Sequence, residues 1–408
     1  MSRKGWRWVP SLYFAEGLPY VIIITVSVIM YKNLGISNAD IALYTSWFYL
    51  PWVIKPLWSP AVDLLKTKRW WVVTMQFLLG VGFACIAFLI PTSFFWQGTL
   101  ALLWLMAFCS STHDIAADGF YMIAQDESDQ SFFVGVRNIF YRVAMVLGQG
   151  VLVMVAGYLS HCVDGMKAAW SIVFGVVGVM LLVISFYHLF SLPKTNEEMT
   201  RSLGSVRDLF ASFFKKKGIV VAMLFILLYR LGEAQLSKIA SPFLLDSQED
   251  GGLGLDNEHV GFIYGTIGVI ALLSGGLMGG FVVARDGLKR WLWPMIFAMN
   301  VPNIVYVFLA FTQITNLFVV SSCVALEQLG YGFGFTAFTL YLIHFSQGEY
   351  KTAHYALCTG FMALGMMLPG MVSGFVQEAL GYDMFFVYVI VCCIPGMVVA
   401  KWLSIDAK

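Results

Sequence analysis

Apolar runs of about 20 residues, the length a helix needs to cross a bilayer, recur along the whole 408-residue chain. Twelve runs are separated by short polar connections and by one longer polar stretch near the midpoint, with six runs on each side. The pattern predicts an all-α integral membrane protein of twelve transmembrane helices in two pseudo-symmetric six-helix bundles. The predicted bundles are residues 1–191 and 218–408, and residues 192–217 form a cytoplasmic linker. The runs begin near Val9, Ile41, Trp70, Gly98, Val134, Lys167, Gly218, His259, Trp291, Thr315, Tyr350 and Tyr382.

Composition agrees with this prediction and narrows the class of protein. The chain is 59% hydrophobic and only 12% charged, which is too apolar for a soluble protein of this size. Its net charge of +1 gives no reason to expect a nucleic-acid partner. The seven cysteines lie mostly inside apolar runs, without the spacing of a zinc site, and no nucleotide-binding loop or catalytic motif stands in a supporting context. We therefore expect no metal, no cofactor and no enzymatic activity.

Basic residues cluster on alternate connections between the runs, and the connections on the other side carry almost none. By the positive-inside rule, the basic connections and both chain termini are predicted to be cytoplasmic. The clusters contain Arg3, Lys4 and Arg7; Lys66, Lys68 and Arg69; the stretch from Lys194 to Lys217; Arg285, Lys289 and Arg290; Lys351; and Lys401 and Lys408.

The two halves repeat one chemical feature. Glu16 lies in the first run and Glu233 in the seventh, while Asp114 lies in the fourth and Glu327 in the tenth. Each half thus has a carboxylate in its own first and fourth helix. A duplicated six-helix unit whose helices line a shared path would produce this pattern.

The stretch Cys109–Tyr121 continues an apolar run without a helix-ending residue, so it places His113, Asp114 and Asp118 inside a membrane helix. Asp114 and Asp118 are four residues apart and share one helix face. An acidic residue at the centre of a bilayer costs roughly 2.5–3.5 kcal/mol, so its usual role is in a water-filled path or a buried pair. Either one of these carboxylates exchanges a proton, or each is permanently ionised and paired with Arg137 or Arg142.

The absence of a nucleotide-binding motif favours an ion gradient as the energy source, and buried carboxylates suit protons. The candidates for proton coupling are Asp114, Asp118, Glu233 and Glu327.

Three buried cations are candidates for binding an anionic substrate: Lys55, Arg142 and Arg230. The planar guanidinium of Arg142 suits a carboxylate of either the protein or a ligand. Arg230 and Glu233 are three residues apart, so they can neutralise each other, and Lys55 can instead extend its ammonium toward the cytoplasm.

The remaining candidates for substrate binding are four polar residues near the predicted path: Glu16, His113, Tyr141 and Tyr229. Asp63, Lys68 and Arg69 at the end of the second run are predicted to act as a gating latch or topology signal. The pairs Gly275/Gly279 and Gly276/Gly280 have the small-xxx-small spacing that lets membrane helices approach closely.

Several of these residues belong to motifs that resemble one known family. The motifs are Gly17-Leu18-Pro19; Lys55-Pro56-Leu57-Trp58-Ser59-Pro60 with Asp63; His113-Asp114-Ile115 with Asp118; Gly135; Tyr141-Arg142; Leu228-Tyr229-Arg230-Leu231-Gly232-Glu233; Glu327 with Gly334-Phe335 and Thr336-Ala337-Phe338; and Tyr355-Ala356-Leu357. Together they make the chain resemble the AmpG-type permeases of the major facilitator superfamily and, more distantly, the acetyl-coenzyme A transporters. The chain departs from the family at Glu16, where a small residue is common, and at His113, where Gln is common. It also has Arg230 where the family has Lys and Glu233 where it has Asp.

The resemblance implies a proton-driven permease of the bacterial inner membrane. We also expect the protein to be a monomer. Its cargo would be peptidoglycan fragments, namely N-acetylglucosaminyl-anhydro-N-acetylmuramic acid with or without its peptide. Such cargo is anionic and amphiphilic, which suits Lys55, Arg142 and Arg230 for carboxylates and aromatic rings for sugar faces. The alternatives are a proton-coupled carrier of another organic anion, such as an acyl-coenzyme A, a siderophore or a sugar acid, and a membrane substrate sensor.

Overall fold

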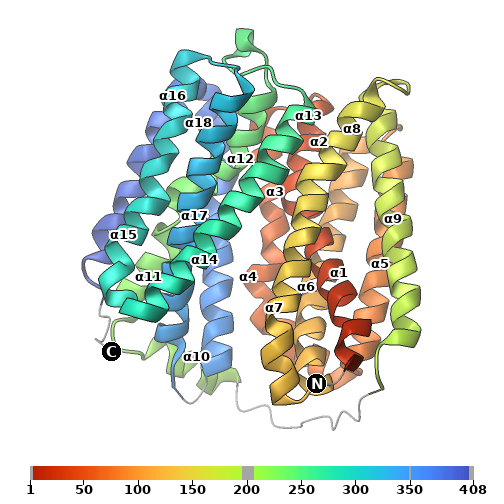
Figure 1. The fold of residues 1–408 in the computed structure, drawn as a ribbon, viewed down its shortest axis with the longest axis vertical. Coiled ribbons are helices and arrows are strands. Elements are labelled where there is room, and N and C mark those ends of the chain that lie inside the picture. The colour runs from red at the N-terminus through yellow and green to blue at the C-terminus, as the bar shows by residue number, and fades with distance from the viewer. Residues whose placement is uncertain (1–2, 195–205, 349–350, 404–408) are drawn as a thin grey trace. The chain divides into compact units, whose positions relative to one another are not determined.

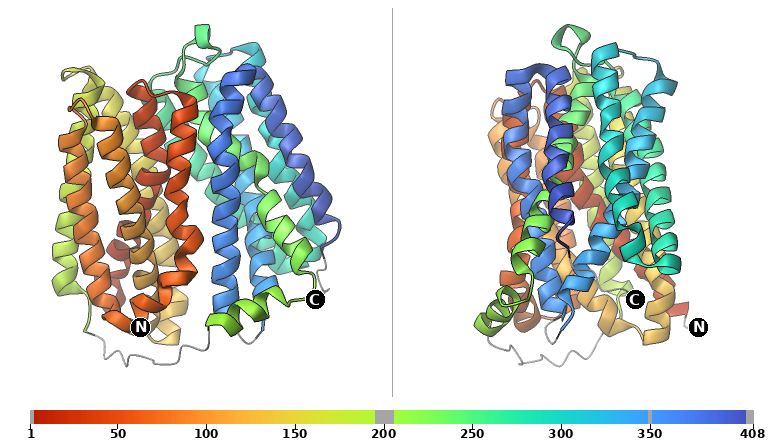
Figure 2. Two further views of the ribbon diagram at one scale, coloured as in Figure 1. Left: turned by 180° about the vertical axis from the view of Figure 1, so that it is seen from behind. Right: turned by 90° about the vertical axis from the view of Figure 1, so that its left-hand side faces the viewer.

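The computed structural model describes residues 3–194, 206–348 and 351–403. This part of the chain is helical and contains no strand, and ten of its helices are long and apolar enough to cross a membrane (Figures 1 and 2). One of the ten, Ala353–Ala400, consists of two helices that meet at Gly381, where φ is 75°. A further helical run, Asn38–Leu65, also has the length of a span. With these two additions the described residues form twelve helical passes, which confirms the predicted all-α fold.

The first half of the chain forms η1 (Arg3–Arg7), α1 (Val9–Val21), η2 (Ile22–Val26), α2 (Ser27–Asn33), α3 (Asn38–Ser46), η3 (Trp47–Tyr49), α4 (Leu50–Leu65), α5 (Lys68–Leu89), α6 (Phe95–Ala124), α7 (Glu127–Met145), η4 (Val146–Leu152), α8 (Val153–Ser160) and α9 (Gly165–Ser191). The second half forms α10 (Val206–Phe214), α11 (Ile219–Leu228), α12 (Leu231–Leu245), η5 (Gln248–Asp250), α13 (Asn257–Val260), η6 (Gly261–Gly268), α14 (Val269–Asp286), α15 (Leu288–Asn300), η7 (Val301–Asn303), α16 (Ile304–Thr312), α17 (Leu317–Ser346) and α18 (Lys351–Ala400).

The helices pack as two compact units. The first unit comprises residues 1–30 and 54–203, and in it α5 packs against α6 and α9 while α1 packs against α6 and α7 (Figure 1). The second unit comprises residues 31–53 and 204–408. In it α17 packs against α14 and α15, and α18 packs against α3, α11 and α12.

The predicted chain boundaries differ from these units in one segment. Residues 31–53, at the turn between the first two spans, pack within the second unit although they belong to the first half of the chain. We call residues 31–53 the hairpin segment. The predicted linker also contains a helix, α10, while its residues 195–205 lie outside the described part of the chain.

Glycines bring α14 and α17 into direct backbone contact. A methyl group on Gly275 of α14 would overlap the Leu329 carbonyl oxygen, and one on Gly332 of α17 would overlap the Leu272 carbonyl oxygen. A methyl group on Gly279 would lie 3.0 Å from the Phe333 carbonyl oxygen, whereas none of the described atoms lies within 4 Å of one on Gly280. Gly275 and Gly279 therefore form the predicted small-residue contact, and Gly280 does not take part.

Gly275→Ala is expected to destabilise the second unit by about 1–3 kcal/mol, because the added methyl group forces two helix backbones apart. Thermal unfolding of the detergent-purified protein measures this loss. Gly280→Ala is the matched control and should leave the unfolding temperature unchanged; equal unfolding temperatures for the two variants would contradict the packing.

Candidate functional site

Five charged side chains meet inside the first unit, and we call them the Asp114 cluster: Glu16 of α1, Lys55 of α4, Asp114 and Asp118 of α6, and Arg137 of α7. Lys55 forms an ion pair and hydrogen bond with Asp114, and Arg137 lies 3.2 Å from Asp118. Asp118 is therefore paired with Arg137, one of the two arginines that the sequence suggested as its partner.

Glu16 is the member of this cluster without a cation of its own. It is 8% exposed, its carboxyl group hydrogen-bonds to that of Asp114, and its Oε2 has no hydrogen-bond partner among the described residues. A carboxylate only accepts hydrogen bonds, so a bond between two carboxyl groups requires one proton. The charge balance agrees, because the cluster holds three carboxyl groups and two cations.

Tyr13 of α1 completes the Asp118 side of the cluster. Its hydroxyl donates to Asp118 at 3.1 Å and accepts from Arg137 Nη1 at 3.1 Å. The Arg137 guanidinium also lies over the Tyr13 ring, 4.6 Å from its centroid, and over the Tyr121 ring at 5.3 Å. These contacts hold Arg137 in place by cation–π attraction as well as by charge.

Arg142 of α7 is a cation of the first unit for which no ion pair is seen among the described residues. Its Nη1 contacts Met145 Sδ at 3.2 Å, and its guanidinium lies 6.0 Å from the centroid of the Tyr141 ring. Tyr141 itself packs over Gly17, beside Glu16: a methyl group on Gly17 would lie 3.1 Å from Tyr141 Cδ2. Arg142 and Tyr141 therefore stay candidates for substrate binding, because no described carboxylate neutralises the guanidinium and an aromatic ring lies beside it.

His113 is bonded within the helical bundle, in a chain of four polar side chains of which His113, Gln76 and His188 are buried. Its Nε2 lies 2.9 Å from Gln76 Nε2, Gln76 Oε1 lies 2.7 Å from His188 Nδ1, and His188 Nε2 lies 2.8 Å from Ser11 Oγ. The chain links α6, α5, α9 and α1. The sequence did not single out Gln76 and His188, because single polar residues in apolar runs do not reveal which helices they join.

The three gating candidates lie at the end of α4 and the start of α5. The Arg69 guanidinium donates to the carbonyl oxygens of Leu189 and Leu192 at the end of α9, with 3.2 Å from Nε to Leu192. A cation at helix-terminal carbonyls stabilises that terminus. Lys68 is buried, with its side chain against Gly119 of α6. The side chain of Asp63 lies outside the described part of the chain.

A second polar group, the Glu327 cluster, lies in the second unit and contains Arg230, Glu233, Tyr264, Tyr306 and Glu327. Glu233 and Glu327 are 7% and 2% exposed and interact electrostatically with each other. The Tyr306 hydroxyl bonds to both Tyr264 and Glu327, and Gln328 Nε2 donates to Glu327 at 2.9 Å. The structure therefore brings the two predicted carboxylates of this half together.

Arg230 stands where the seventh span is interrupted. Helix α11 ends at Leu228 and α12 begins at Leu231, as in the discontinuous helices of many transporters. Arg230 donates to the Tyr331 hydroxyl, and its guanidinium lies 5.1 Å from the centroid of the Phe335 ring. Tyr229 is 1% exposed, stacks on Phe338 and donates to the Gly334 carbonyl oxygen at 3.1 Å, so it packs in the core of the unit.

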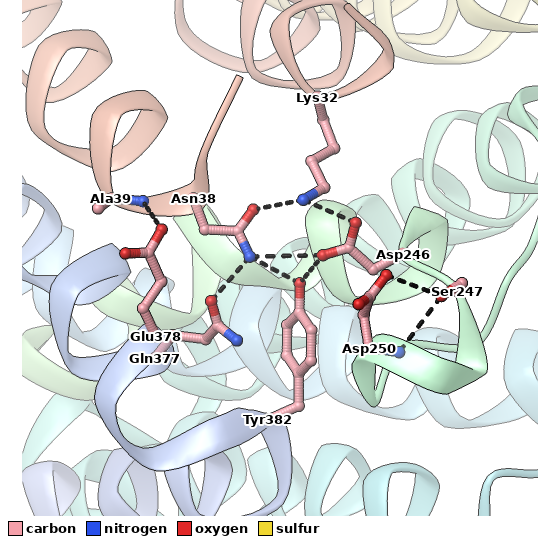
Figure 3. A network of polar contacts seen from close by, with 9 residues as sticks. All are labelled: Lys32, Asn38, Ala39, Asp246, Ser247, Asp250, Gln377, Glu378 and Tyr382. Carbon is pink, nitrogen blue, oxygen red and sulfur yellow. Dashed lines mark hydrogen bonds and ion pairs between the residues drawn. The ribbon is translucent and has the colours of Figure 1, made fainter. Parts of the chain in front are cut away.

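The hairpin segment is bound to α12 and α18 by a network of polar contacts, drawn in Figure 3. Lys32 forms an ion pair with Asp246 at 2.6 Å and donates to Asn38 Oδ1 at 2.9 Å. Asn38 Nδ2 donates to Gln377 Oε1 at 2.7 Å and lies 2.8 Å from the Tyr382 hydroxyl.

Two backbone contacts complete this hairpin network. The Ala39 N–H donates to Glu378 at 3.0 Å, and Gly374 of α18 leaves room for the Asn38 carbonyl oxygen. The sequence analysis missed the network because its members lie near the ends of four separate helices.

The helical passes and their buried ionisable groups define a class: a multi-pass membrane protein of the secondary-transporter type. A match to the Major Facilitator Superfamily extends over residues 11–353, so the chain belongs to this superfamily. Members of this superfamily are transporters and not enzymes.

Individual relatives agree with this membership. The chain is 26% identical over 403 residues to the "Anhydromuropeptide permease" of Escherichia coli (strain K12), covering 95% of this chain and 77% of that protein. It is 26% identical over 418 residues to the "Putative transporter AmpG 4" of Rickettsia conorii, covering 96% of this chain and 95% of that protein. These relatives confirm the resemblance to AmpG-type permeases. A crystal structure of nucleoside transporter NupG has the same fold, with a TM-score of 0.73 at 18% identity, covering 98% of this chain and 100% of that one.

Lys55→Met is expected to destabilise the first unit, because Asp114 keeps a charge that has lost its partner. The pair is about a quarter exposed, so a loss of about 1–3 kcal/mol, between surface and buried ion pairs, is expected. Thermal unfolding of Lys55→Met and of Lys55→Met/Asp114→Asn measures the effect. The double variant should recover most of the loss; equal stability of both variants would contradict the pairing.

Proposed function

We propose that the protein is a proton-coupled transporter that imports peptidoglycan fragments across the bacterial inner membrane by alternating access. The cargo is N-acetylglucosaminyl-anhydro-N-acetylmuramic acid, with or without its peptide. In this proposal the protein works as a monomer. Both termini lie in the cytoplasm, an orientation supported by the alternating basic connections.

The observation that carries the proton coupling is the unequal charge of the Asp114 cluster. Lys55 and Arg137 neutralise Asp114 and Asp118, and Glu16 remains as an additional buried carboxyl group. A buried carboxyl group without a cation is uncharged only while it holds a proton. Loss and uptake of that proton change the charge of the cluster, which couples the proton gradient to the conformational cycle.

The cargo assignment is supported by the similarity to the anhydromuropeptide permease over 95% of the chain and by one feature of the first unit. Arg142 has no ion pair with a described residue and lies beside the Tyr141 ring. A guanidinium next to an aromatic ring suits a carboxylate attached to a sugar. We therefore assign Arg142 and Tyr141 to cargo binding.

Alternating access requires the hairpin network to break once in each cycle. The network joins residues 31–53 to α12 and α18, whereas the remainder of the first two spans packs in the first unit. If the hairpin segment moves together with the remainder of the first two spans, the Lys32–Asp246 ion pair and the bonds of Asn38 must break. The network acts as a gate in this proposal.

Glu16→Gln and Asp114→Asn are expected to abolish cargo accumulation driven by an inward proton gradient in proteoliposomes. Glutamine keeps the hydrogen bond of a protonated Glu16 but cannot release a proton, so Glu16→Gln should retain exchange of labelled for unlabelled cargo. Glu16→Asp is the matched control and should retain accumulation.

Two results would contradict the proposal in different ways. Absence of uptake by the folded wild-type protein would overturn the cargo assignment. Normal accumulation by Glu16→Gln would overturn the role of the Asp114 cluster while leaving the cargo in place.

Asp246→Asn is expected to open the gate more often, because it removes the ion pair with Lys32. Losing about 1–2 kcal/mol from the closed state corresponds to a roughly five- to thirty-fold change in population. Labelling of a cysteine at the buried Ala39 position, in a background without the native cysteines, measures the opening rate. Asp250→Asn in the same loop is the control, and equal labelling of both variants would contradict the gate.

A further inference from the structure

Lys238 of α12 is a buried cation that the sequence analysis did not identify. Its side chain is 2% exposed. Its ammonium donates to Thr45 Oγ1 of the hairpin segment at 2.9 Å and lies 5.4 Å from the centroid of the Tyr49 ring. Both contacts lie within the second unit. A fully buried lysine in a transmembrane helix indicates a functional position by default.

The charge of Lys238 is not balanced by the protein. Lys32 and Lys55 form ion pairs with Asp246 and Asp114, but within the described ranges no carboxylate forms an ion pair with Lys238. An ammonium group has three hydrogen-bond donors, and the Thr45 hydroxyl accepts one of them. The ring of Tyr49 supplies cation–π attraction but no counter-charge. By the rule that keeps Glu16 protonated, a buried lysine without a counter-charge is held as the neutral amine. It becomes an ammonium, with donors available to an anion, when water or a carboxylate reaches it.

A second polar group beside Lys238 also lacks a partner. Ser46 is fully buried, and its hydroxyl has no hydrogen-bond partner among the described residues. A methyl group on Gly370 of α18 would lie 2.7 Å from Ser46 Oγ and 3.5 Å from Lys238 Cγ. Thr45, Ser46 and Lys238 therefore meet in one small region where α3, α12 and α18 come together. This region offers hydrogen-bond donors, and among the described residues no carboxylate accepts from them.

We propose that Lys238 and Ser46 form a binding site for a carboxylate of the cargo, which takes the place of the Thr45 hydroxyl. One carboxylate oxygen accepts from the Lys238 ammonium and the other from the Ser46 hydroxyl, and the sugar lies against the Tyr49 ring. This inference rests on the proposed function, because the anion arrives with the transported molecule.

The site is closed in this structure and opens with the gate. Thr45 and Ser46 belong to the hairpin segment, and both are completely buried against the second unit. When the hairpin segment moves away, Lys238 loses Thr45 and exposes its donors. A cargo carboxylate then takes the place of the Thr45 hydroxyl at Lys238, and when the hairpin segment closes again Ser46 donates to the second carboxylate oxygen. Cargo is therefore recruited on the side of the membrane where the hairpin network opens.

The test compares two ligands on the purified full-length protein in lipid nanodiscs. One is N-acetylglucosaminyl-anhydro-N-acetylmuramic acid, and the other is the same disaccharide with its carboxyl group converted to an amide. Calorimetric titration gives the ratio of the two affinities for the wild type and each variant. Lys238→Gln should weaken binding of the acid at least tenfold and change binding of the amide less than twofold. Ser46→Ala should shift the ratio in the same direction by about threefold.

Lys216→Gln is the matched control, because Lys216 donates to the backbone carbonyls of Phe345 and Gln347 outside the spans. It should leave both affinities unchanged. An unchanged ratio in Lys238→Gln, with the wild type binding both ligands, would overturn this inference and leave the proposed function intact. A folded wild type that binds neither ligand would overturn the proposed cargo and this site together.

Discussion

Charge balance inside the hydrocarbon is the constraint on which the proposed function of this protein depends. A charged group within a span is tolerated when a partner neutralises it, and Lys55 with Asp114 and Arg137 with Asp118 meet this condition. Glu16 and Lys238 do not. In the proposed cycle a proton neutralises Glu16 and a cargo carboxylate pairs with Lys238, so these two groups match the two species of an anion–proton symporter.

Close helix packing positions these groups. Helices α14 and α17 touch through Gly275 and Gly332, and α3 reaches α18 at Gly370 and Gly374. In the first unit, Gly148 lies in the wide π-helical turn η4 and faces Val21 of α1. Turns of this kind interrupt regular helical hydrogen bonding and recur at functional sites. The described helices thus combine close contacts at glycines with a locally irregular turn at η4.

The hydrophobic pattern alone predicts the twelve spans, because the length of each apolar run is fixed by the thickness of the bilayer. It also predicts which residues lie at membrane depth, including Asp114, Glu233 and Glu327. It does not predict which way each helix faces. For that reason the sequence predicts His113, one residue from Asp114, as a cargo-binding candidate but does not reveal its bond to Gln76.

The direction in which each helix face points also explains the other differences between the sequence-based predictions and the structure. Tyr229 packs in the core of its unit, and Lys238 escaped notice because a single lysine in an apolar run does not show whether a carboxylate faces it. Glu16 was identified, but its hydrogen bond to Asp114 joins two helices far apart in sequence. The hairpin network likewise depends on long-range contacts between residues 31–53 and α12 or α18.

The most direct measurement is the electric charge moved per cargo molecule during uptake into proteoliposomes, recorded for the disaccharide acid and for its amide. If one proton enters with each cargo molecule, the singly charged acid should move no net charge, and the amide should move one positive charge. Equal charge for the two cargoes, or uptake of the amide without a current, would contradict proton coupling through an unbalanced carboxyl group.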